Sequence, residues 1–540
     1  MKILEFMAQE TAVSKQRVLS LAMVSGVTNS LLLVIINQAA TKLQDGVVEK
    51  QLLFQYLLAF LLFIFAQRTS QRQAVSAVEH ALQGFRTRIA DKVRRCELRT
   101  VEQLGDISLY SSLTQGANTI SQSVMYLITG IESLVVLIFA SLYLLWLSPL
   151  SFLIAAVLIG SAVTLLIRHY QKTFQELSTA AGKEGEFFSR FVGILQGFKR
   201  LKIHQQESDA VFADIQQLST ETGNLKSQSN VRLLEDILLL NVIFYSLLLL
   251  VVFMLPSLLP THEENLFQII TTILFMMEPV ALISAAYPNL SKTNVAISNL
   301  YRLEGKLDTT HSHQSNQPQK SSYEHFNSIG LHQASFVYKN AEQRPLFATG
   351  PTTLTCQRGS LTFIAGNNGS GKSTLLKLLT SLYSPNDGCI QVDNQPIGAD
   401  DYGGYRCLFS VVFNDSHLFD RLYGVDSTST KIVNHWLEKL GLSDKTSYEK
   451  GCFTNTDLST GERKRLAFIN AIMQRRPILV LDEPAADQDV VFRQLLYEEI
   501  LPELKASGKT LIVSTHDEDY FSYADQVLYL QDGNLNPNKT

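Results

Sequence analysis

The chain has 540 residues, and its formal net charge of −4 gives no reason to expect nucleic acid as a partner. This length is expected to hold two or more domains, at roughly 150 residues each. Five cysteines without C-x-x-C spacing argue against a disulfide framework or a zinc site and favour a reducing compartment. They are Cys96, Cys356, Cys389, Cys407 and Cys452.

Six apolar segments in the first part of the chain are predicted to cross a membrane, because a bilayer core requires about 20 apolar residues in a helix. They cover residues 18–40, 52–66, 123–146, 150–167, 237–255 and 266–287. The segment 52–66 is the weakest by length and needs flanking polar residues to complete its crossing. The first segment is longer than the apolar part of a signal peptide, and a second span follows it at once. We therefore expect the N-terminus to stay attached.

Basic residues gather in two of the connections between these spans. Between the second and third spans lie Arg68, Arg72, Arg86, Arg88, Lys92, Arg94, Arg95 and Arg99. A similar set, from Arg168 to Arg232, separates the fourth span from the fifth. The positive-inside rule places both stretches in the cytoplasm, and an even number of crossings places both chain ends there as well.

These two inner stretches have helical apolar spacing and no proline, so the spans are predicted to continue into the cytoplasm as long helices. A helical extension of 25 residues would project roughly 37 Å, which is far enough to touch a second domain. The turns of the two hairpins are expected near residues 104–108 and 203–211. The alternative is that both stretches are solvated loops without such contact.

A polar tether is expected at residues 309–323, because this stretch has almost no apolar residue with which to offset the entropy of folding. It separates a membrane domain, residues 1–308, from a soluble domain, residues 324–540. His311 and His313 have no neighbouring ligands, so a solvated tether is a better interpretation of this stretch than a metal site.

The soluble part contains a complete phosphate-binding loop, G-N-N-G-S-G-K-S, at residues 366–373. A strand-like apolar run precedes it and a helix-like run follows, as this kind of loop requires. Its backbone N–H groups converge on a triphosphate, Lys372 pairs with the β- and γ-phosphates, and Ser373 reaches Mg²⁺. The predicted ATP-binding residues here are Gly366, Asn367, Asn368, Gly369, Ser370, Gly371, Lys372, Ser373 and Thr374.

Four further residues complete the predicted ATP site. Tyr338 precedes the loop by about 28 residues, where its ring could stack on adenine or belong to the core of a strand. Asp482 ends an apolar run and is expected to hold Mg²⁺ through water. Glu483 is the candidate general base for the attacking water. His516 follows another strand-like run and is expected to contact the γ-phosphate, so the predicted catalytic residues are Glu483, His516 and Lys372.

A second phosphate-binding element is predicted at residues 458–462, which read L-S-T-G-E. A helical segment follows directly. Ser459 and the backbone N–H of Gly461 therefore stand at a helix N-terminus, where anions are stabilised.

Taken in this order, the motifs resemble those of ATP-binding-cassette proteins, and six spans ahead of the motor resemble a half-size exporter. This resemblance implies a membrane α-helical domain fused to an α/β P-loop ATPase domain. It also implies a homodimer with two composite ATP sites, because in the family the signature loop of one subunit closes the site of the other. The cytoplasmic hairpin turns would then transmit hydrolysis to the spans, which are surrounded by membrane lipid.

A narrower resemblance rests on residues 481–489, L-D-E-P-A-A-D-Q-D. Most exporters are expected to read S-A-L-D where this chain has A-D-Q-D. The form found here resembles the cyclic-peptide exporter group, of the pyoverdine and syringomycin type, which moves peptides and siderophores across the bacterial inner membrane. The resemblance also places Asp489 among the nucleotide-binding residues.

Two residues depart from the family pattern. Asn414 stands where a glutamine usually links Mg²⁺ to the membrane domain, so either Asn414 reaches the metal through water or Asp415 replaces it; we favour Asn414. Glu462 replaces the signature glutamine and adds a charge near the second nucleotide, on the side expected to be exposed. Neither departure removes a catalytic group, so an active ATPase is expected.

The substrate is predicted to be a peptide secondary metabolite. A multidrug or lipid exporter has the same architecture and is the first alternative. The second is a membrane regulator that senses ATP without transport, against which the complete catalytic set argues. Glu132 and Glu278 lie within spans, where an acid costs at least about 2.5 kcal/mol, so a role facing a substrate cavity is expected. The alternative is that each carboxyl group pairs with a neighbouring helix or lies close to the membrane interface.

Overall fold

The computed structural model describes residues 2–10, 15–44, 49–104, 109–110, 112–254, 265–308, 323–339, 344–415, 417–425 and 430–536. Contacts divide the chain into two compact units. The helical unit comprises Met1–Arg94 with Leu104–Leu307, and the α/β unit comprises Arg95–Gln103 with Asp308–Thr540. The expected tether lies outside the described residues except for Tyr323.

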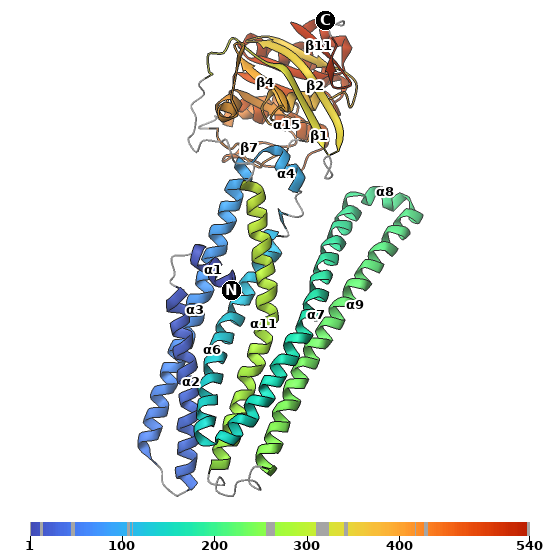
Figure 1. The fold of residues 1–540 in the computed structure, drawn as a ribbon. Helices are drawn as coiled ribbons and strands as arrows, with labels where there is room; N and C mark the ends of the chain where they lie inside the picture. Colours follow the sequence, from blue (N-terminus) through green and yellow to red (C-terminus); the bar gives the residue numbers. More distant parts are fainter. Residues whose placement is uncertain are drawn as a thin grey trace. The chain divides into compact units, whose positions relative to one another are not determined.

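Six long helices and the short helices α1 and α8 make up the described part of the helical unit (Figure 1). They are α1 (Lys2–Glu10), α2 (Lys15–Gln44), α3 (Lys50–Arg95), α6 (Ala117–Leu147), α7 (Pro149–Gln196), α8 (Phe198–Ile203), α9 (Gln205–Leu249) and α11 (Leu266–Asp308). One π-helical turn, Ser112–Gly116, precedes α6, and another, Leu250–Met254, extends α9. Six of these helices are long and apolar enough to cross a membrane, which confirms the predicted number of spans.

The predicted extensions of the spans are also helical. Helices α3, α7 and α9 have 46, 48 and 45 residues, and α7 packs against α9 along its length (Figure 1). A very short link joins α6 to α7. There Ser148 is extended, its side chain accepts a hydrogen bond from the N–H of Ser151, and Pro149 occupies the first helical position.

The connection between the two arms of this hairpin begins earlier than the predicted turn at residues 203–211 and overlaps it only at residues 203–204. Helix α7 ends at Gln196, where Gly197 leaves the helical region with φ −87° and ψ 6°, and the short α8 follows. His204 breaks the helix again, and α9 begins at the next residue. Helix α7 therefore ends several residues before the predicted turn. The other predicted turn, near residues 104–108, lies outside the described residues apart from Leu104.

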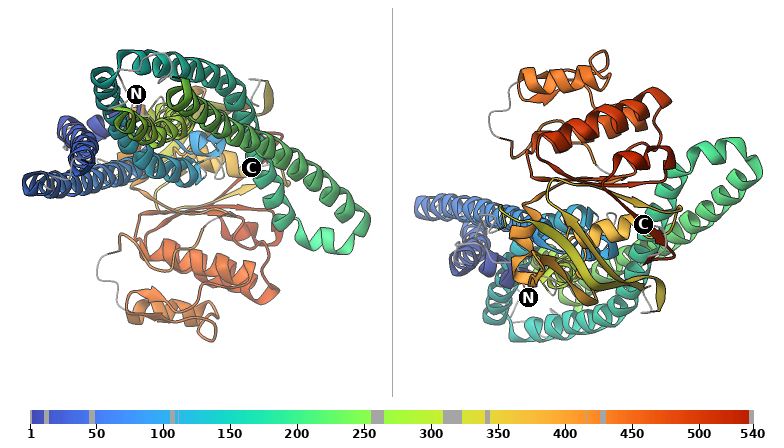
Figure 2. Two further views of the ribbon diagram at one scale, coloured as in Figure 1. Left: turned by 90° about the horizontal axis from the view of Figure 1, so that it is seen from below. Right: turned by 90° about the horizontal axis from the view of Figure 1, so that it is seen from above.

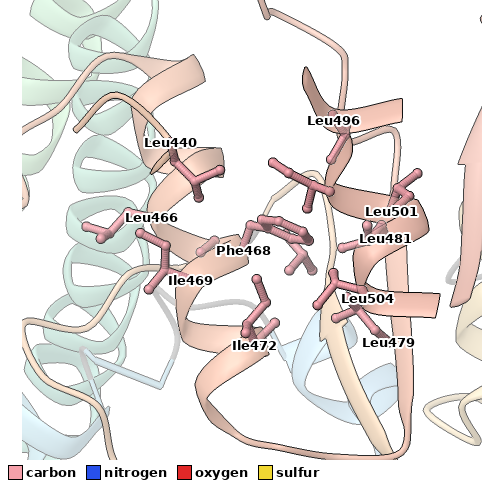
Figure 3. Packing of buried hydrophobic residues seen from close by; sticks show 14 of the residues in the cluster. Leu440, Leu466, Phe468, Ile469, Ile472, Leu479, Leu481, Leu496, Leu501 and Leu504 are labelled. Carbon is pink, nitrogen blue, oxygen red and sulfur yellow. The ribbon is translucent and has the colours of Figure 1, made fainter. Parts of the chain in front are cut away.

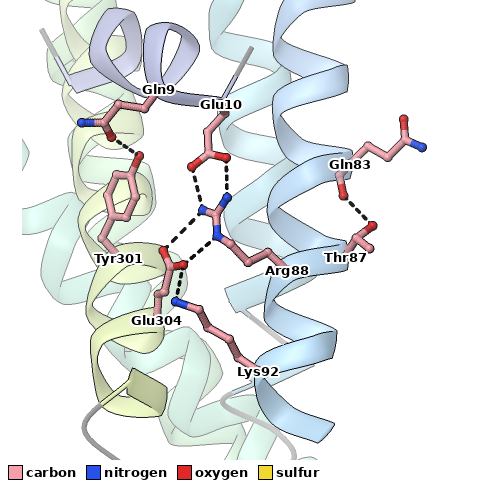
Figure 4. A network of polar contacts seen from close by, with 8 residues as sticks. All are labelled: Gln9, Glu10, Gln83, Thr87, Arg88, Lys92, Tyr301 and Glu304. Atoms are coloured by element: carbon pink, nitrogen blue, oxygen red, sulfur yellow. Dashed lines mark hydrogen bonds and ion pairs between the residues drawn. The ribbon is translucent and has the colours of Figure 1, made fainter. Parts of the chain in front are cut away.

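An ion-pair network joins three helices of the helical unit (Figure 4). The guanidinium of Arg88 in α3 donates to both oxygens of Glu10 in α1 at 2.6 Å and to Glu304 in α11 at 2.7 Å. Lys92 donates to the same Glu304 carboxylate at 2.7 Å. These forked contacts fix how α1, α3 and α11 pack, because a planar guanidinium binds two carboxylates only in a defined orientation.

Helices α2 and α6 approach each other closely at Gly26. A Cβ atom on this residue would lie 2.8 Å from Cβ of Val135 and 2.9 Å from the carbonyl oxygen of Glu132. One residue earlier, the hydroxyl of Ser25 donates to the Glu132 carboxylate at 2.5 Å. Small residues commonly permit such contacts between membrane helices, and here the contact leads directly to a buried carboxyl group.

The α/β unit contains two main sheets. The mixed sheet has the order β12-β11-β3-β10-β9-β6, and the antiparallel sheet has the order β2-β1-β4-β5. Its strands are β1 (Ser328–Lys339), β2 (Pro345–Gln357), β3 (Leu361–Ala365), β4 (Asp387–Val392), β5 (Gln395–Pro396), β6 (Phe409–Val412), β7 (Tyr448–Glu449), β8 (Cys452–Phe453), β9 (Ile478–Asp482), β10 (Thr510–Thr515), β11 (Gln526–Gln531) and β12 (Asn534–Leu535). Its helices are α4 (Leu98–Leu104), α12 (Lys372–Leu379), α13 (Tyr402–Arg406), α14 (Thr430–Lys439), α15 (Thr460–Met473), α16 (Val490–Gln494) and α17 (Leu501–Ala506), with the turns η4 (Ala399–Asp401), η5 (Leu495–Ile500) and η6 (Glu518–Tyr523).

Alternate residues of the central strands supply two hydrophobic cores. Leu479 and Leu481 of β9 face a cluster formed with α14, α15 and α17 (Figure 3), whereas Ile478 and Val480 face α12 and the antiparallel sheet. In the view from above, orange and red helices lie on one side of the mixed sheet and the yellow strands β1 and β2 on the other (Figure 2). Because successive side chains of a strand point to opposite faces, a strand that is apolar at every position fills both cores. A shift by one residue would exchange the two sets of side chains, so the packing fixes the register of the strand.

We expect Gly26→Val to destabilise the helical unit, because its added carbon atoms cannot fit between α2 and α6. Overpacking of this kind costs about 1–3 kcal/mol. The readout is the thermal unfolding temperature of the purified protein in detergent. Gly84→Val in α3 is the matched control, since nothing lies within 4 Å of a Cβ at that position. Equal unfolding temperatures for the two variants would contradict the close contact.

Candidate functional site

One group of the predicted site residues meets at one edge of the mixed sheet. Strands β3, β10, β9 and β6 are parallel, with Ala365 paired to Thr515 and Asp482 paired to Ser514. The phosphate loop follows β3, Glu483 follows β9, His516 follows β10, and Asn414 lies two residues after β6. Carboxyl ends of parallel strands form the usual ligand-binding edge of such a sheet, so these residues converge there.

Glycines shape the phosphate loop. Gly369 and Gly371 have φ of 80° and 102°, which residues with a side chain rarely adopt. A Cβ on Gly366 would lie 2.3 Å from the carbonyl oxygen of Leu530. Helix α12 begins at Lys372, so the loop lies at a helix N-terminus, and a cavity of about 270 Å³ runs from Gly366 to Ser370 and reaches His516. Within the described residues the buried Ser370 hydroxyl has no hydrogen-bond partner, as expected of a group that serves a ligand.

Lys372 and Glu483 form an ion pair within this site. The ammonium of Lys372 lies 3.0 Å from the Glu483 carboxylate and donates to the carbonyl oxygens of Gly366 at 2.8 Å and Asn367 at 3.0 Å. Glu483 itself has a left-handed backbone with φ of 49°, held by hydrogen bonds from its N–H to the carbonyl and hydroxyl of Ser514. Such strain persists only where surrounding contacts impose it, and it is concentrated at functional sites.

Oxygen ligands suited to Mg²⁺ lie beside this pair. Asp482 is buried and, within the part of the chain that the structure describes, accepts one hydrogen bond, from the Ser514 hydroxyl at 2.6 Å. Its second carboxylate oxygen remains for a ligand. Ser373 exposes its hydroxyl in the first turn of α12, and Asn414 is exposed at the same sheet edge. A carboxylate, a hydroxyl and an amide oxygen are the donors that a hard divalent cation prefers, so the residues present fit Mg²⁺.

Tyr338 lies in a network of hydroxyl groups. Its hydroxyl donates to that of Tyr383 at 3.0 Å, and the hydroxyl of Tyr383 donates to the Glu102 carboxylate in α4 at 2.8 Å. Lys377 donates to the same carboxylate at 3.2 Å. The ring of Tyr383 is buried and stacks on Phe336 at 4.5 Å. Burial, and then the Tyr338 and Glu102 contacts, raise the pKa of Tyr383, so its hydroxyl stays protonated as a donor.

The contact with Glu102 explains why Arg95–Gln103 belongs to the α/β unit, although the domain boundary was expected near residue 308. Leu98 packs against the core that contains Phe336, and the guanidinium of Arg99 lies 5.6 Å from the Phe336 ring. Sequence analysis missed Glu102 and Tyr383. The predicted hairpin turn near Glu102 indicated that this segment contacts the soluble domain, but it did not indicate which residue Glu102 would bind.

The second group of predicted residues lies at the start of α15. Ser459 caps this helix in a reciprocal pair with Glu462, whose carboxylate accepts from the Ser459 N–H at 2.9 Å and from its hydroxyl at 2.7 Å. The Ser459 hydroxyl, followed by its N–H, lowers the pKa of Glu462, which is therefore ionised at neutral pH. Among the described residues, Ser459, Gly461 and Asp489 form no hydrogen bond with the phosphate loop.

Three comparisons with known proteins agree with this geometry. The profile described as "ABC transporter" matches residues 350–486. "ATP-binding protein SyrD" from Pseudomonas syringae pv. syringae is 30% identical over 539 residues, covering 95% of this chain and 92% of its own length. "Probable syringafactin export ATP-binding/permease protein SyfD" from strain B728a of the same organism is 29% identical over 212 residues, covering 36% of this chain and 32% of its own. The solved "Structure of a bacterial Atm1-family ABC exporter with ATP bound" matches the fold with a TM-score of 0.77 at 19% identity, covering 97% of this chain and 95% of that one.

Tyr383→Phe is expected to loosen α4, because it removes the hydroxyl that joins Glu102 to Tyr338 but keeps the stacked ring. Amide hydrogen exchange across Leu98–Leu104 should become about three- to tenfold faster, the effect of losing one or two hydrogen bonds. Tyr423→Phe is the control, since that ring is exposed. If exchange in α4 is the same in both variants, the hydroxyl contact does not hold this helix.

Proposed function

Because this chain belongs to the ABC transporter family, we propose that it exports a peptide secondary metabolite as a homodimer. It is a half-transporter of the exporter type, a multi-pass membrane protein whose ATPase domain couples ATP hydrolysis to transport. The observation that carries the proposal is the likeness to SyrD over 95% of the chain. A relative named for syringafactin export and the A-D-Q-D sequence at residues 486–489 also support a peptide substrate.

Residues at the sheet edge take defined roles in the proposed hydrolysis. Glu483 accepts the proton of the attacking water, and its constrained backbone holds the carboxylate toward the phosphate loop. Lys372, released from Glu483, stabilises the β- and γ-phosphate oxygens, and His516 contacts the γ-phosphate. Tyr338 would stack on adenine, and Thr374, whose hydroxyl donates to that of Tyr338 at 3.5 Å, would also contact the nucleotide.

Ser373, Asp482 and Asn414 would hold Mg²⁺. When bound, this ion neutralises the charge that develops between the β- and γ-phosphates. We favour Asn414 over Asp415 as the residue that replaces the usual glutamine, because it stands at the aligned position and carries the same amide group, one methylene shorter.

A second copy of the chain completes each proposed ATP site. Ser459 and Gly461 present a helix N-terminus, yet within the described residues they form no hydrogen bond with their own phosphate loop. In the homodimer they would contact the nucleotide held by the partner, together with Asp489. Each dimer then contains two equivalent sites, as expected of a symmetric pair built from a single repeated chain.

The proposed location is the bacterial inner membrane, with both chain ends and the ATPase domain in the cytoplasm. Basic residues in the two long cytoplasmic extensions support this orientation through the positive-inside rule. Lipid surrounds the spans, and ATP is available only on the side where the ATPase domain lies.

A cavity in the helical unit is a candidate substrate site. It has a volume of about 390 Å³ and is lined mainly by apolar side chains of α6, α7, α9 and α11. Tyr170 and Tyr287 meet edge to face at 4.5 Å on its wall. Asp236 supplies a buried carboxylate, which lies 3.2 Å from His169. Aromatic walls with one acidic group suit an amphipathic substrate that carries a positive charge.

Glu132 and Glu278 do not line this cavity. Glu132 is paired with Ser25 of α2, which agrees with the alternative of a carboxyl group bonded to a neighbouring helix. Glu278 is exposed on the helical unit. Sequence analysis missed Asp236 as a candidate substrate-binding residue. Its position directly before the charge-free fifth span was the one feature that could have indicated it.

The apolar lining also supports the second candidate, a multidrug or lipid exporter, because such substrates are recognised mainly by apolar contact. An ATP sensor that does not transport is the weaker reading. The chain has the residues proposed for hydrolysis, including Glu483 with its strained backbone beside Lys372. A protein that only binds ATP would not need a general base at this position.

Export is tested by comparing spent medium from cells in which the gene is deleted, restored, or restored as Glu483→Gln. A single peptide is expected to disappear on deletion and to return only with the intact glutamate. In purified protein the same variant should hydrolyse ATP about 10²- to 10⁴-fold more slowly, the usual contribution of a general base. Identical peptide profiles combined with the expected loss of hydrolysis would reject the peptide substrate and direct attention to lipids and drugs.

Removing Mg²⁺ with EDTA should slow ATP hydrolysis at least about 100-fold, because the charge stabilisation that the metal supplies is worth several kcal/mol. Binding of a fluorescent ATP analogue should persist more weakly, since Lys372 and the loop N–H groups remain. Phosphate release and fluorescence titration measure the two effects separately. Full hydrolysis in EDTA would contradict the proposed roles of Ser373, Asp482 and Asn414.

A further inference from the structure

A hollow beside helix α3 combines basic, amide and apolar side chains. It has a volume of about 600 Å³, and its lining includes Ile64, Gln67, Arg68, Gln71 and Arg72 of α3 with Met125 of α6. The lining residues of α3 recur every three or four positions, so they form one face of the helix. None of them lines the cavity proposed for the substrate or the cavity beside the phosphate loop.

The two arginines lie where the second span leaves the bilayer. Its apolar run, residues 52–66, is shorter than the roughly 20 residues that a helix needs to cross the bilayer core. A crossing of about 20 residues that begins at Leu52 ends near Gln71. Arg68 and Arg72 therefore lie at the depth of the lipid headgroups, where long basic side chains reach the phosphates.

The same face of α3 is apolar on the membrane side of the hollow. Leu57, Leu61 and Ile64 precede Arg68 at helical spacing, and all three are exposed within the helical unit. Inside a bilayer, lipid acyl chains cover apolar surface of this kind, because they are as apolar as leucine. The face thus changes from a surface for acyl chains to a surface for a headgroup within about two helical turns.

Arg68 and Arg72 lack an acidic partner within the chain. Among the described residues, neither side chain forms an ion pair or a hydrogen bond. Helix α3 has no acidic residue before Glu79, and Glu79 already accepts a hydrogen bond from the Ser121 hydroxyl of α6. Like charges one turn apart on a helix repel each other. A negatively charged ligand between the two arginines would remove this repulsion.

The spacing of the two guanidinium groups suits a phosphate. Cβ atoms at positions i and i+4 of a helix lie about 5–6 Å apart, so both side chains can contact one phosphodiester. Guanidinium N–H groups match phosphate oxygens in geometry, and the amides of Gln67 and Gln71 add further donors. These donors favour a headgroup with a net negative charge, because the two arginines would repel the ammonium group of a zwitterionic headgroup.

We propose that this hollow is a binding site for an anionic phospholipid. Its phosphate lies between Arg68 and Arg72, and its acyl chains run along the apolar face of α3. Basic pockets between transmembrane helices hold anionic headgroups in this way. The site depends on the membrane spans and is independent of the peptide substrate and the homodimer of the proposed function.

The test is native mass spectrometry of the full-length protein in detergent, titrated with dioleoyl phosphatidylglycerol or dioleoyl phosphatidylcholine. These lipids share their acyl chains and differ in headgroup charge. Arg68→Gln combined with Arg72→Gln removes both charges, and Arg68→Lys combined with Arg72→Lys keeps them. Arg86→Gln combined with Lys199→Gln is the matched control, because it removes two charges from exposed side chains that do not line the hollow.

We expect the unsubstituted protein and the control to bind phosphatidylglycerol equally, and both more tightly than phosphatidylcholine. The double glutamine variant should bind phosphatidylglycerol about 10- to 30-fold more weakly, since each basic residue at a membrane surface contributes roughly fivefold. Its affinity for phosphatidylcholine should stay the same. The double lysine variant should lose less affinity than the glutamine variant, because an ammonium group still attracts phosphate as a point charge.

Three results would overturn the lipid site. If the glutamine variant and the control bind phosphatidylglycerol equally, the two arginines do not hold the headgroup. If an equal concentration of glycerophosphoglycerol, the headgroup without chains, displaces the lipid, the hollow binds a free anion instead. If the glutamine variant loses the mass of a dimer while its lipid binding is unchanged, a second copy of the chain covers this face. Should the double variant fail to fold, Arg72→Gln alone decides, with an expected loss of about fivefold.

Discussion

Parallel pairing of β3, β10, β9 and β6 is the constraint on which the ATPase site depends. Because these strands run in one direction and in a fixed register, the loops after them emerge at a single edge. The phosphate loop, Glu483 and His516 are distant in sequence and are brought together by the pairing of these strands. Ser514 then fixes the local geometry. Its hydroxyl donates to the Asp482 carboxylate and accepts from the N–H of Glu483, whose backbone is strained.

Features that depend on local sequence are predicted well. Apolar run length identifies six spans, and the glycine spacing of residues 366–373 identifies the phosphate loop, because each signal lies within one short segment. The turn predicted at residues 203–211 lies too far along the chain, because helical spacing continues through both arms of the hairpin and gives no sign of the break at Gly197. Prediction also missed the bond between Glu102 and Tyr383, which are 281 residues apart, since nothing in either segment specifies its partner.

The acidic residue in the signature loop has a structural explanation. Glu462 replaces a glutamine in the family pattern, and its carboxylate turns back to the N–H and hydroxyl of Ser459. A glutamine could accept the same N–H, but the charge strengthens both bonds and suits a helix N-terminus. In the proposed function this arrangement would weaken phosphate binding, because the Ser459 hydroxyl already donates to Glu462 and a negative charge lies beside it.

The segment Arg95–Gln103 makes the ATPase a discontinuous domain. Nine residues encoded between two membrane spans supply a carboxylate that the buried Tyr383 hydroxyl uses, and they cover part of the core around Phe336. A soluble fragment that begins after the tether would lack these residues, leaving Tyr383 without its acceptor and part of an apolar surface open to water. Rates of ATP hydrolysis measured on such a fragment would therefore describe a domain whose structure differs from that of the ATPase domain in the whole chain.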